Sequence, residues 1–113
     1  MKEKDNTPPP GRSRRRHPRV EALGHAFANI GAGEEGSVLN LSLGGLLLRL
    51  KRALTPGSSY ILKLYLGNEV AVVEARVVRL LTGTEECLAG MEFLQVSPRD
   101  RAALLKFLGP AGA

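Results

Sequence analysis

Short runs with a strict period of two residues, separated by turn residues, constrain this chain more than any other feature. In residues 59–66 and again in residues 71–77 every second residue is apolar, as expected for half-buried antiparallel strands. Turn residues at 55–58, 67–68 and 82–84 separate these runs, and the Gly67-Asn68 pair suits a tight hairpin. The pattern predicts strands over residues 20–28, 36–43, 46–52, 59–66, 69–81 and 86–95.

Strands of this number and spacing favour a small barrel, because closing the sheet removes its exposed edges. The period changes after Ser97, where a serine, a proline and an acid at Asp100 form a helix start, and Gly109-Pro110 provides a stop. The expected fold class is all-β with one helix, an antiparallel β-barrel followed by a C-terminal helix over 98–108. We place a flexible tail at 1–11 and the folded domain at 12–109.

The charge is concentrated at one end of the chain. Residues 1–19 contain seven Lys and Arg against two Asp and Glu, whereas residues 20–113 contain nine of each sign, so the whole net charge of +5 resides in the N-terminal segment. Five of these bases form a basic arm over 12–19. An anionic partner at this arm is the first hypothesis, and a merely solvated basic tail is the alternative.

The sequence gives little support for catalysis. It has only two histidines and one cysteine, Cys87, with no metal-ligand spacing, no close pair of acids and no phosphate-binding glycine loop. A single cysteine permits no internal disulfide, and no apolar run is long enough for a signal peptide or a membrane span. We therefore expect a cytoplasmic protein that is not an enzyme and has no cofactor, metal or membrane partner.

The segment from Val38 to Gly45 carries the most specific polar residues of the domain. Strand alternation predicts that Leu39, Leu41 and Leu43 enter the core, whereas Val38, Asn40 and Ser42 face outward. Asn and Ser can donate and accept hydrogen bonds, and the glycines that follow leave space for a flat ligand. Taken by itself, this segment is better explained by a solvated strand face before a turn.

The arm and this segment together resemble a known family. Arg15 and Arg19 form Arg-x-x-x-Arg, and Asn40, Ser42 and Gly45 form Asn-x-Ser-x-x-Gly about 20 residues later. This order and separation are similar to the double signature of PilZ domains, the bacterial receptors for cyclic di-GMP. The resemblance extends from Arg12 to Leu108, and the fold it implies is a six-stranded antiparallel barrel with a C-terminal helix.

The resemblance implies a role for each matched residue. Arg15 and Arg19 would hold the phosphates and guanine edges while the arm folds across the barrel, Asn40 and Ser42 would meet a guanine edge or phosphate, and Gly45 would leave space. Asn40 forfeits the charge-assisted bond to guanine that an Asp would make. The site also includes three further arginines. These are Arg14, which resembles family members that take an intercalated ligand dimer, Arg16, and Arg79, where some relatives place a ring-stacking residue.

The register of the arm is open, because Arg12 and Arg16 satisfy the same spacing. The choice of Arg15 and Arg19 leaves Val20 to open the first strand, as in the family. The function implied is a cyclic di-GMP receptor or adaptor that orders its arm on binding and signals to an unidentified protein effector. The alternatives are a degenerate PilZ adaptor that binds no nucleotide and a small basic-arm barrel that binds nucleic acid, which the shortage of aromatic residues for base stacking disfavours.

Overall fold

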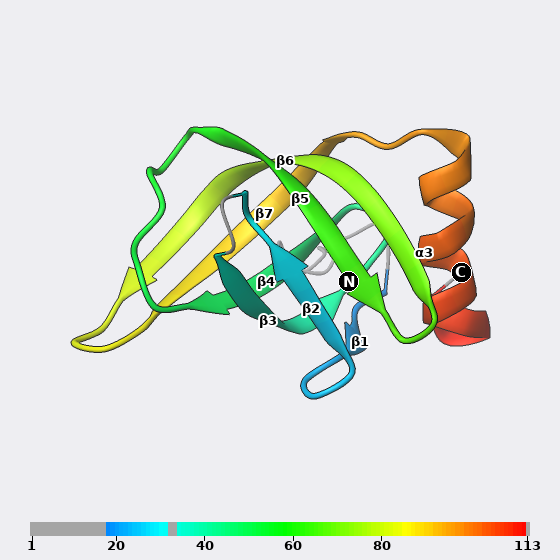
Figure 1. Ribbon diagram of the computed structural model, residues 1–113, viewed down its shortest axis with the longest axis horizontal. Helices are drawn as coiled ribbons and strands as arrows, with labels where there is room; N and C mark the ends of the chain where they lie inside the picture. The colour runs from blue at the N-terminus through cyan, green and yellow to red at the C-terminus, as the bar shows by residue number, and fades with distance from the viewer. Residues whose placement is uncertain (1–17, 32–33, 113) are drawn as a thin grey trace, which may run out of the picture.

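The computed structural model describes residues 18–31 and 34–112. Within these residues seven strands and one helix follow one another in order (Figure 1). They are β1 (Val20–Glu21), β2 (Ala26–Asn29), β3 (Glu35–Leu41), β4 (Gly45–Leu50), β5 (Ser59–Leu66), β6 (Glu69–Thr82), β7 (Cys87–Gln95) and α3 (Pro98–Gly112). Of the predicted tail and arm, only Pro18 and Arg19 lie inside the described residues.

The strands form a closed antiparallel barrel. Strand order runs β3-β2-β5-β6-β7-β4, and β3 closes the ring because it pairs with both β2 and β4. The two-residue strand β1 pairs with the far end of β3 and adds a short edge to the ring. Helix α3 lies at one end of the barrel, beside the turn between β5 and β6 (Figure 1). The predicted fold class, a six-stranded barrel with a C-terminal helix, is confirmed.

The first predicted strand is split in two, so the expectation of one strand over 20–28 is wrong. A turn interrupts it at Leu23–His25, where Gly24 has a φ of 85° and the His25 backbone N–H donates to the Ala22 carbonyl at 2.8 Å. Glycine adopts this positive φ without the steric penalty that a side chain imposes. The split lets β1 pair with residues 40–41 of β3 while β2 pairs with residues 35–37.

The alternation predicted for β5 and β6 is confirmed, because their inward residues are almost fully buried. These inward residues are Leu62, Leu64 and Leu66 in β5, and Ala71, Val73, Ala75 and Val77 in β6. Strands β5 and β6 pair in continuous register from Ser59↔Arg76 to Leu66↔Glu69, across the two-residue turn Gly67-Asn68. Gly67 has a φ of 65°, as the predicted tight hairpin requires. These two strands form the most regular wall of the barrel.

The alternation predicted for the 38–43 segment is only partly right. Val38 is fully buried rather than outward, and Leu39 is half-buried. The reason is a β-bulge between Val38 and Asn40, where the pairing of β3 with β4 passes over Leu39. One extra residue reverses the inside–outside pattern on either side of it. Leu41 therefore remains in the core, as predicted.

Helix α3 begins where the sequence predicts it to begin. The Ser97 hydroxyl accepts a hydrogen bond from the Asp100 backbone N–H at 3.1 Å and donates to the Asp100 carboxylate at 2.7 Å. The Val72 backbone N–H on β6 also donates to Asp100, at 3.0 Å. The hydroxyl and then the amide lower the pKa of Asp100, because both stabilise the carboxylate. Helical geometry breaks at Gly109, which has a φ of 67°.

Candidate functional site

A pocket of about 440 Å³ lies on the barrel wall where β1 meets β3 and where β4 meets β7. It brings together segments that are distant in sequence, from both halves of the predicted ligand motif. Its lining residues are Arg19, Glu21, Asn40, Gly44, Leu46, Leu47, Val78, Arg79, Gly90, Met91 and Glu92. We call this site the motif pocket.

The structure joins the two halves of the motif directly. Arg19 Nη1 donates a hydrogen bond to Asn40 Oδ1 at 2.8 Å, across 21 positions of sequence. Pairing of β1 with β3 creates this proximity, because Val20 lies opposite Leu41 and Glu21 lies opposite Asn40. Arg19 is exposed and is one of the residues that line the pocket. The bulge at Leu39 sets the local register of β3, which places Asn40 within hydrogen-bond distance of Arg19.

Ser42 is placed differently from the prediction. Its exposed fraction is 4%, so its side chain does not stand outside beside Asn40 as strand alternation predicted. Strand β3 ends at Leu41, and the chain turns at residues 42–44. The Ser42 hydroxyl accepts from the Gly44 backbone N–H at 3.1 Å and donates to the Gly45 carbonyl at 3.4 Å. Ser42 thus closes the turn that links the motif strand to β4.

The structure gives a reason for Gly45 that does not depend on a ligand. A Cβ at this position would lie 2.2 Å from the Met91 carbonyl oxygen on β7. This is far inside van der Waals contact, and the obstacle is backbone rather than a flexible side chain. Only glycine therefore permits β4 to approach β7 at this point.

A second bulge shapes the opposite wall of the pocket. The pairing of β6 with β7 shifts between Val77 and Arg79, which makes Val78 an extra residue. Val77 is buried, whereas Val78 is 57% exposed and Arg79 is also exposed. Both Val78 and Arg79 line the pocket, and bulges of this kind commonly redirect side chains beside functional sites. The sequence singled out Arg79 but gave no reason to consider Val78.

Two acidic residues in the pocket were missed by the sequence-based reasoning, which considered the acids scattered. Glu21 and Glu92 both line it. The Glu92 carboxylate is already bound by Arg76 Nη2 at 2.6 Å. Glu21 lies two residues after Arg19, a local signal that indicates proximity to the motif, but its place opposite Asn40 depends on the pairing of β1 with β3.

The remaining predicted arginines, Arg14, Arg15 and Arg16, lie outside the described residues, and so does Arg12 of the alternative register. Within residues 18–31 and 34–112, no group of three His, Cys, Asp or Glu side chains is arranged to hold a metal ion. In the same part of the chain, no helix is both long and apolar enough to cross a membrane.

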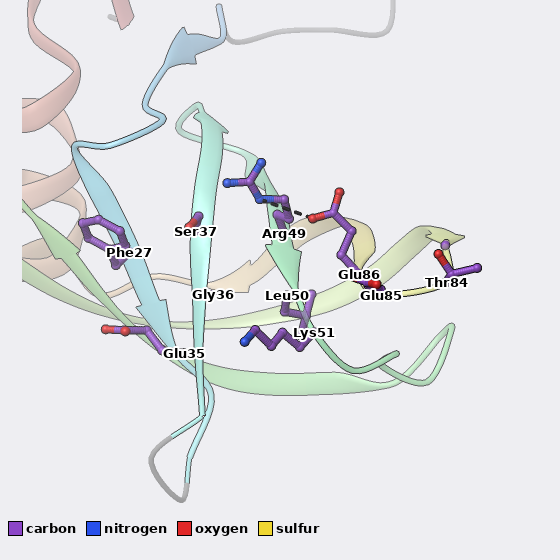
Figure 2. A pocket seen from close by; sticks show the side chains of 11 residues that line it. Phe27, Glu35, Gly36, Ser37, Arg49, Leu50, Lys51, Thr84, Glu85 and Glu86 are labelled. Carbon is purple, nitrogen blue, oxygen red and sulfur yellow. Dashed lines mark ion pairs between the residues drawn. The ribbon is translucent and has the colours of Figure 1, made fainter.

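A larger pocket, of about 760 Å³, lies at the other end of β3, β4 and β7 (Figure 2). Two cations, Arg49 and Lys51, face three carboxylates there, and Arg49 Nε lies 3.8 Å from Glu86 Oε1. The carboxylates disfavour a phosphate ligand because like charges repel. No residue of the predicted motif lines this pocket.

Two aromatic side chains are exposed on neighbouring strands of the barrel. Phe27 is 38% exposed and Tyr65 is 36% exposed, and they lie opposite each other on β2 and β5. Lys63 Nζ lies 5.6 Å from the centre of the Tyr65 ring. Neither aromatic residue lines the motif pocket, so they do not supply a base-stacking surface at the candidate site.

Together, the fold and the pocket define a small closed β-barrel with a candidate ligand pocket on its wall, lined in part by Arg19. The sequence profile of the PilZ domain matches residues 13–109, and the chain therefore belongs to the PilZ family. No curated protein matches the chain.

Solved structures with the same fold include three PilZ-containing proteins. YcgR from Escherichia coli, in complex with c-di-GMP, has a TM-score of 0.69 and 23% identity over 84% of this chain and 44% of its own. MotI/DgrA, the inhibitor of motility from Bacillus subtilis, has a TM-score of 0.69 and 24% identity over 83% of this chain and 49% of its own. PlzA from Borreliella burgdorferi, in complex with c-di-GMP, has a TM-score of 0.54 and 17% identity over 88% of this chain and 43% of its own. The chain thus spans less than half the length of each of these proteins.

Proposed function

We propose that this protein is a receptor for cyclic di-GMP and that the ligand binds in the motif pocket. The observation that carries the proposal is the hydrogen bond from Arg19 to Asn40, which unites the two halves of the motif at one pocket. Membership of the PilZ family supports it, as do the complexes of YcgR and PlzA with c-di-GMP. The larger pocket lacks the motif and is rich in carboxylates, so it is the weaker candidate.

The proposed contacts follow from the chemistry of guanidinium groups. Arg19, just before β1, and Arg79, on β6, both line the pocket, and each can bind a phosphate or the O6 and N7 edge of guanine with two parallel hydrogen bonds. We propose that Arg14, Arg15 and Arg16 add further guanidinium groups from the arm, and that Arg14 permits an intercalated ligand dimer. We propose that Asn40, on β3, contacts a guanine edge or a phosphate of the ligand.

Ser42 and Gly45 serve the site through its backbone. The Ser42 hydroxyl holds the turn after Asn40, and Gly45 lets β4 approach β7 beside the pocket. We propose that both residues act mainly by keeping the pocket in shape, so that the ligand meets a preorganised β3–β4 turn. A contact between the Ser42 hydroxyl and the ligand would require that turn to open, since the side chain is buried.

The proposed mode of action is a binding event without chemistry. We propose that the arm over 12–19 becomes ordered against the barrel when the ligand binds, and that the resulting surface contacts an effector protein. The protein would then act as a second-messenger receptor in the bacterial cytoplasm, with no catalytic residue and no cofactor.

Isothermal titration calorimetry with cyclic di-GMP tests this function. We expect saturable binding by the wild type and a loss of roughly 10- to 100-fold in affinity for Arg19→Ala, the range given by losing a charge-assisted hydrogen bond. Arg49→Ala is the matched control, because it removes the same charge from the larger pocket and leaves affinity unchanged. Absence of binding by the wild type, or equal binding by wild type and Arg19→Ala, would contradict the proposal.

The same titration resolves the register of the arm and separates the alternatives. Loss of binding in Arg15→Ala but not in Arg12→Ala supports the Arg15 and Arg19 register. A folded wild type that binds no nucleotide but retains a protein partner would indicate a degenerate adaptor. A salt-sensitive shift of single-stranded DNA in a gel, without cyclic di-GMP binding, would indicate the nucleic-acid module.

A further inference from the structure

The motif residues that line the pocket supply fewer hydrogen-bond acceptors than a guanine base needs. The Watson–Crick edge of guanine presents two donors, N1–H and the N2 amino group, beside the O6 acceptor. Asn40 has no carboxylate that could accept from both donors, and its Oδ1 already accepts from Arg19 Nη1 at 2.8 Å. One lone pair of Oδ1 remains, and the Asn40 amide nitrogen is a donor. Arginines offer only donors.

Two carboxylates line the pocket, and their surroundings differ. The Glu92 carboxylate forms an ion pair with Arg76 at 2.6 Å, and Arg76 is not one of the residues that line the pocket. The side chain of Glu21 is exposed and makes no hydrogen bond or ion pair with another side chain of the described residues. Both oxygens of the Glu21 carboxylate are therefore free of competing described groups.

The position of Glu21 suits the missing role. It lies directly opposite Asn40 in the pairing of β1 with β3, so the two side chains share one face of the sheet. Directly paired residues have Cβ atoms about 5 Å apart. The Glu21 carboxylate thus lies on the strand next to Asn40, and both residues line the same pocket.

We infer that Glu21 recognises the guanine base, with its two carboxylate oxygens accepting from N1–H and from the N2 amino group. This inference rests on the proposed function and adds a specificity-determining residue to it. Adenine presents one donor and one lone pair along the corresponding edge, so one oxygen of Glu21 would face the lone pair of adenine N1. Glu21 therefore favours cyclic di-GMP over cyclic di-AMP.

The direction of the change in affinity when Glu21 is neutralised distinguishes recognition of the base by Glu21 from simple proximity to the ligand. Cyclic di-GMP carries two phosphate charges, and a carboxylate that only lies near it repels it. Neutralising such a bystander would tighten binding. Neutralising an acceptor that receives two hydrogen bonds weakens binding instead, because the buried donors of the base lose their partner.

The experiment compares Glu21→Gln, Glu21→Ala and the control Glu35→Gln by calorimetry with cyclic di-GMP and with cyclic di-AMP. Glu35 is an exposed acid on β3 that lines the larger pocket, so its variant matches the charge change away from the site. We expect Glu21→Gln and Glu21→Ala to lose roughly 5- to 150-fold in affinity for cyclic di-GMP, the range for a bidentate base contact, and to narrow the preference over cyclic di-AMP. Glu35→Gln should match the wild type.

Equal or tighter cyclic di-GMP binding by Glu21→Gln, with a selectivity equal to that of the wild type, overturns the inference while leaving the proposed function intact. Failure of the wild type to bind cyclic di-GMP overturns both. Thermal unfolding of each variant, followed by circular dichroism, verifies that the barrel is folded at the temperature of the titration. Glu21→Asp keeps the charge on a side chain that is one methylene shorter. We expect it also to bind cyclic di-GMP more weakly than the wild type, because the shorter carboxylate lies farther from the base.

Discussion

Replacing Gly45 with alanine would place a methyl group against the backbone of the neighbouring strand. The added Cβ would lie 2.2 Å from the Met91 carbonyl oxygen, 3.2 Å from the Met91 carbonyl carbon and 3.3 Å from Glu92 Cα. None of these atoms belongs to a flexible side chain. To relieve the overlap, β4 and β7 must separate by about 1 Å at this point.

This separation weakens the barrel at a junction that closes it. The Phe93 backbone N–H donates to the Gly44 carbonyl at 2.9 Å, and a shift of this size would stretch that bond beyond useful length. Overpacking costs about 1–3 kcal/mol and a lost hydrogen bond about 1 kcal/mol, so the free energy of unfolding should fall by about 2–4 kcal/mol. For a domain of this size, the midpoint of thermal unfolding should fall by roughly 10–25 °C.

Urea unfolding followed by circular dichroism measures this change, and Gly90→Ala provides the matched control. Gly90 lies on β7 opposite Leu47, and a Cβ there would be 3.5 Å from Arg79 Cβ, an ordinary contact. We expect Gly90→Ala to unfold within about 0.5 kcal/mol of the wild type. If Gly45→Ala and Gly90→Ala unfold at the same urea concentration, close approach of β4 to β7 is not the reason for glycine at this position.

Two further predictions concern the core and the helix cap. Leu62→Ala removes a fully buried side chain from β5 and should lower the free energy of unfolding by about 2–5 kcal/mol; a change below about 1 kcal/mol in urea unfolding would place this residue outside a packed core. The hydrogen bonds from the Ser97 hydroxyl and the Val72 N–H lower the pKa of Asp100, so its contribution to stability is complete above the usual carboxyl pKa and is lost as the pH falls through the lower pKa of the folded state. Urea midpoints measured between pH 5 and pH 2.5 should therefore fall less in Asp100→Asn than in the wild type, and equal slopes would contradict this role.

Local patterns were sufficient to predict the regular parts of the fold. The period of two in β5 and β6 assigned their buried faces correctly, because each alternate side chain contacts a continuous core. The Gly67-Asn68 hairpin and the helix start at Ser97 depend on contacts between residues close in sequence, and both were confirmed. The two halves of the motif could likewise be paired from their order and spacing, and the bond from Arg19 to Asn40 agrees with that pairing.

Most of the features that sequence reasoning missed depend on how each strand pairs with two neighbours in the barrel. The bulges at Leu39 and Val78 and the split before β2 adjust the register of one strand to two neighbours, and no local pattern encodes a register shared among three strands. Ser42 appeared outward because alternation was extended past the true end of β3.

The sequence by itself therefore determined the class of fold and the family signature, since periodicity and spacing are local properties of the chain. Only the tertiary structure decided which side chains share that pocket. Glu21 and Val78 reach it through strand pairing and a bulge, and Gly45 is required by the approach of a strand nearly fifty residues away. These contacts exist because the sheet closes into a ring. Closure brings together segments that are far apart in the sequence, and no local pattern in those segments indicates that they will meet.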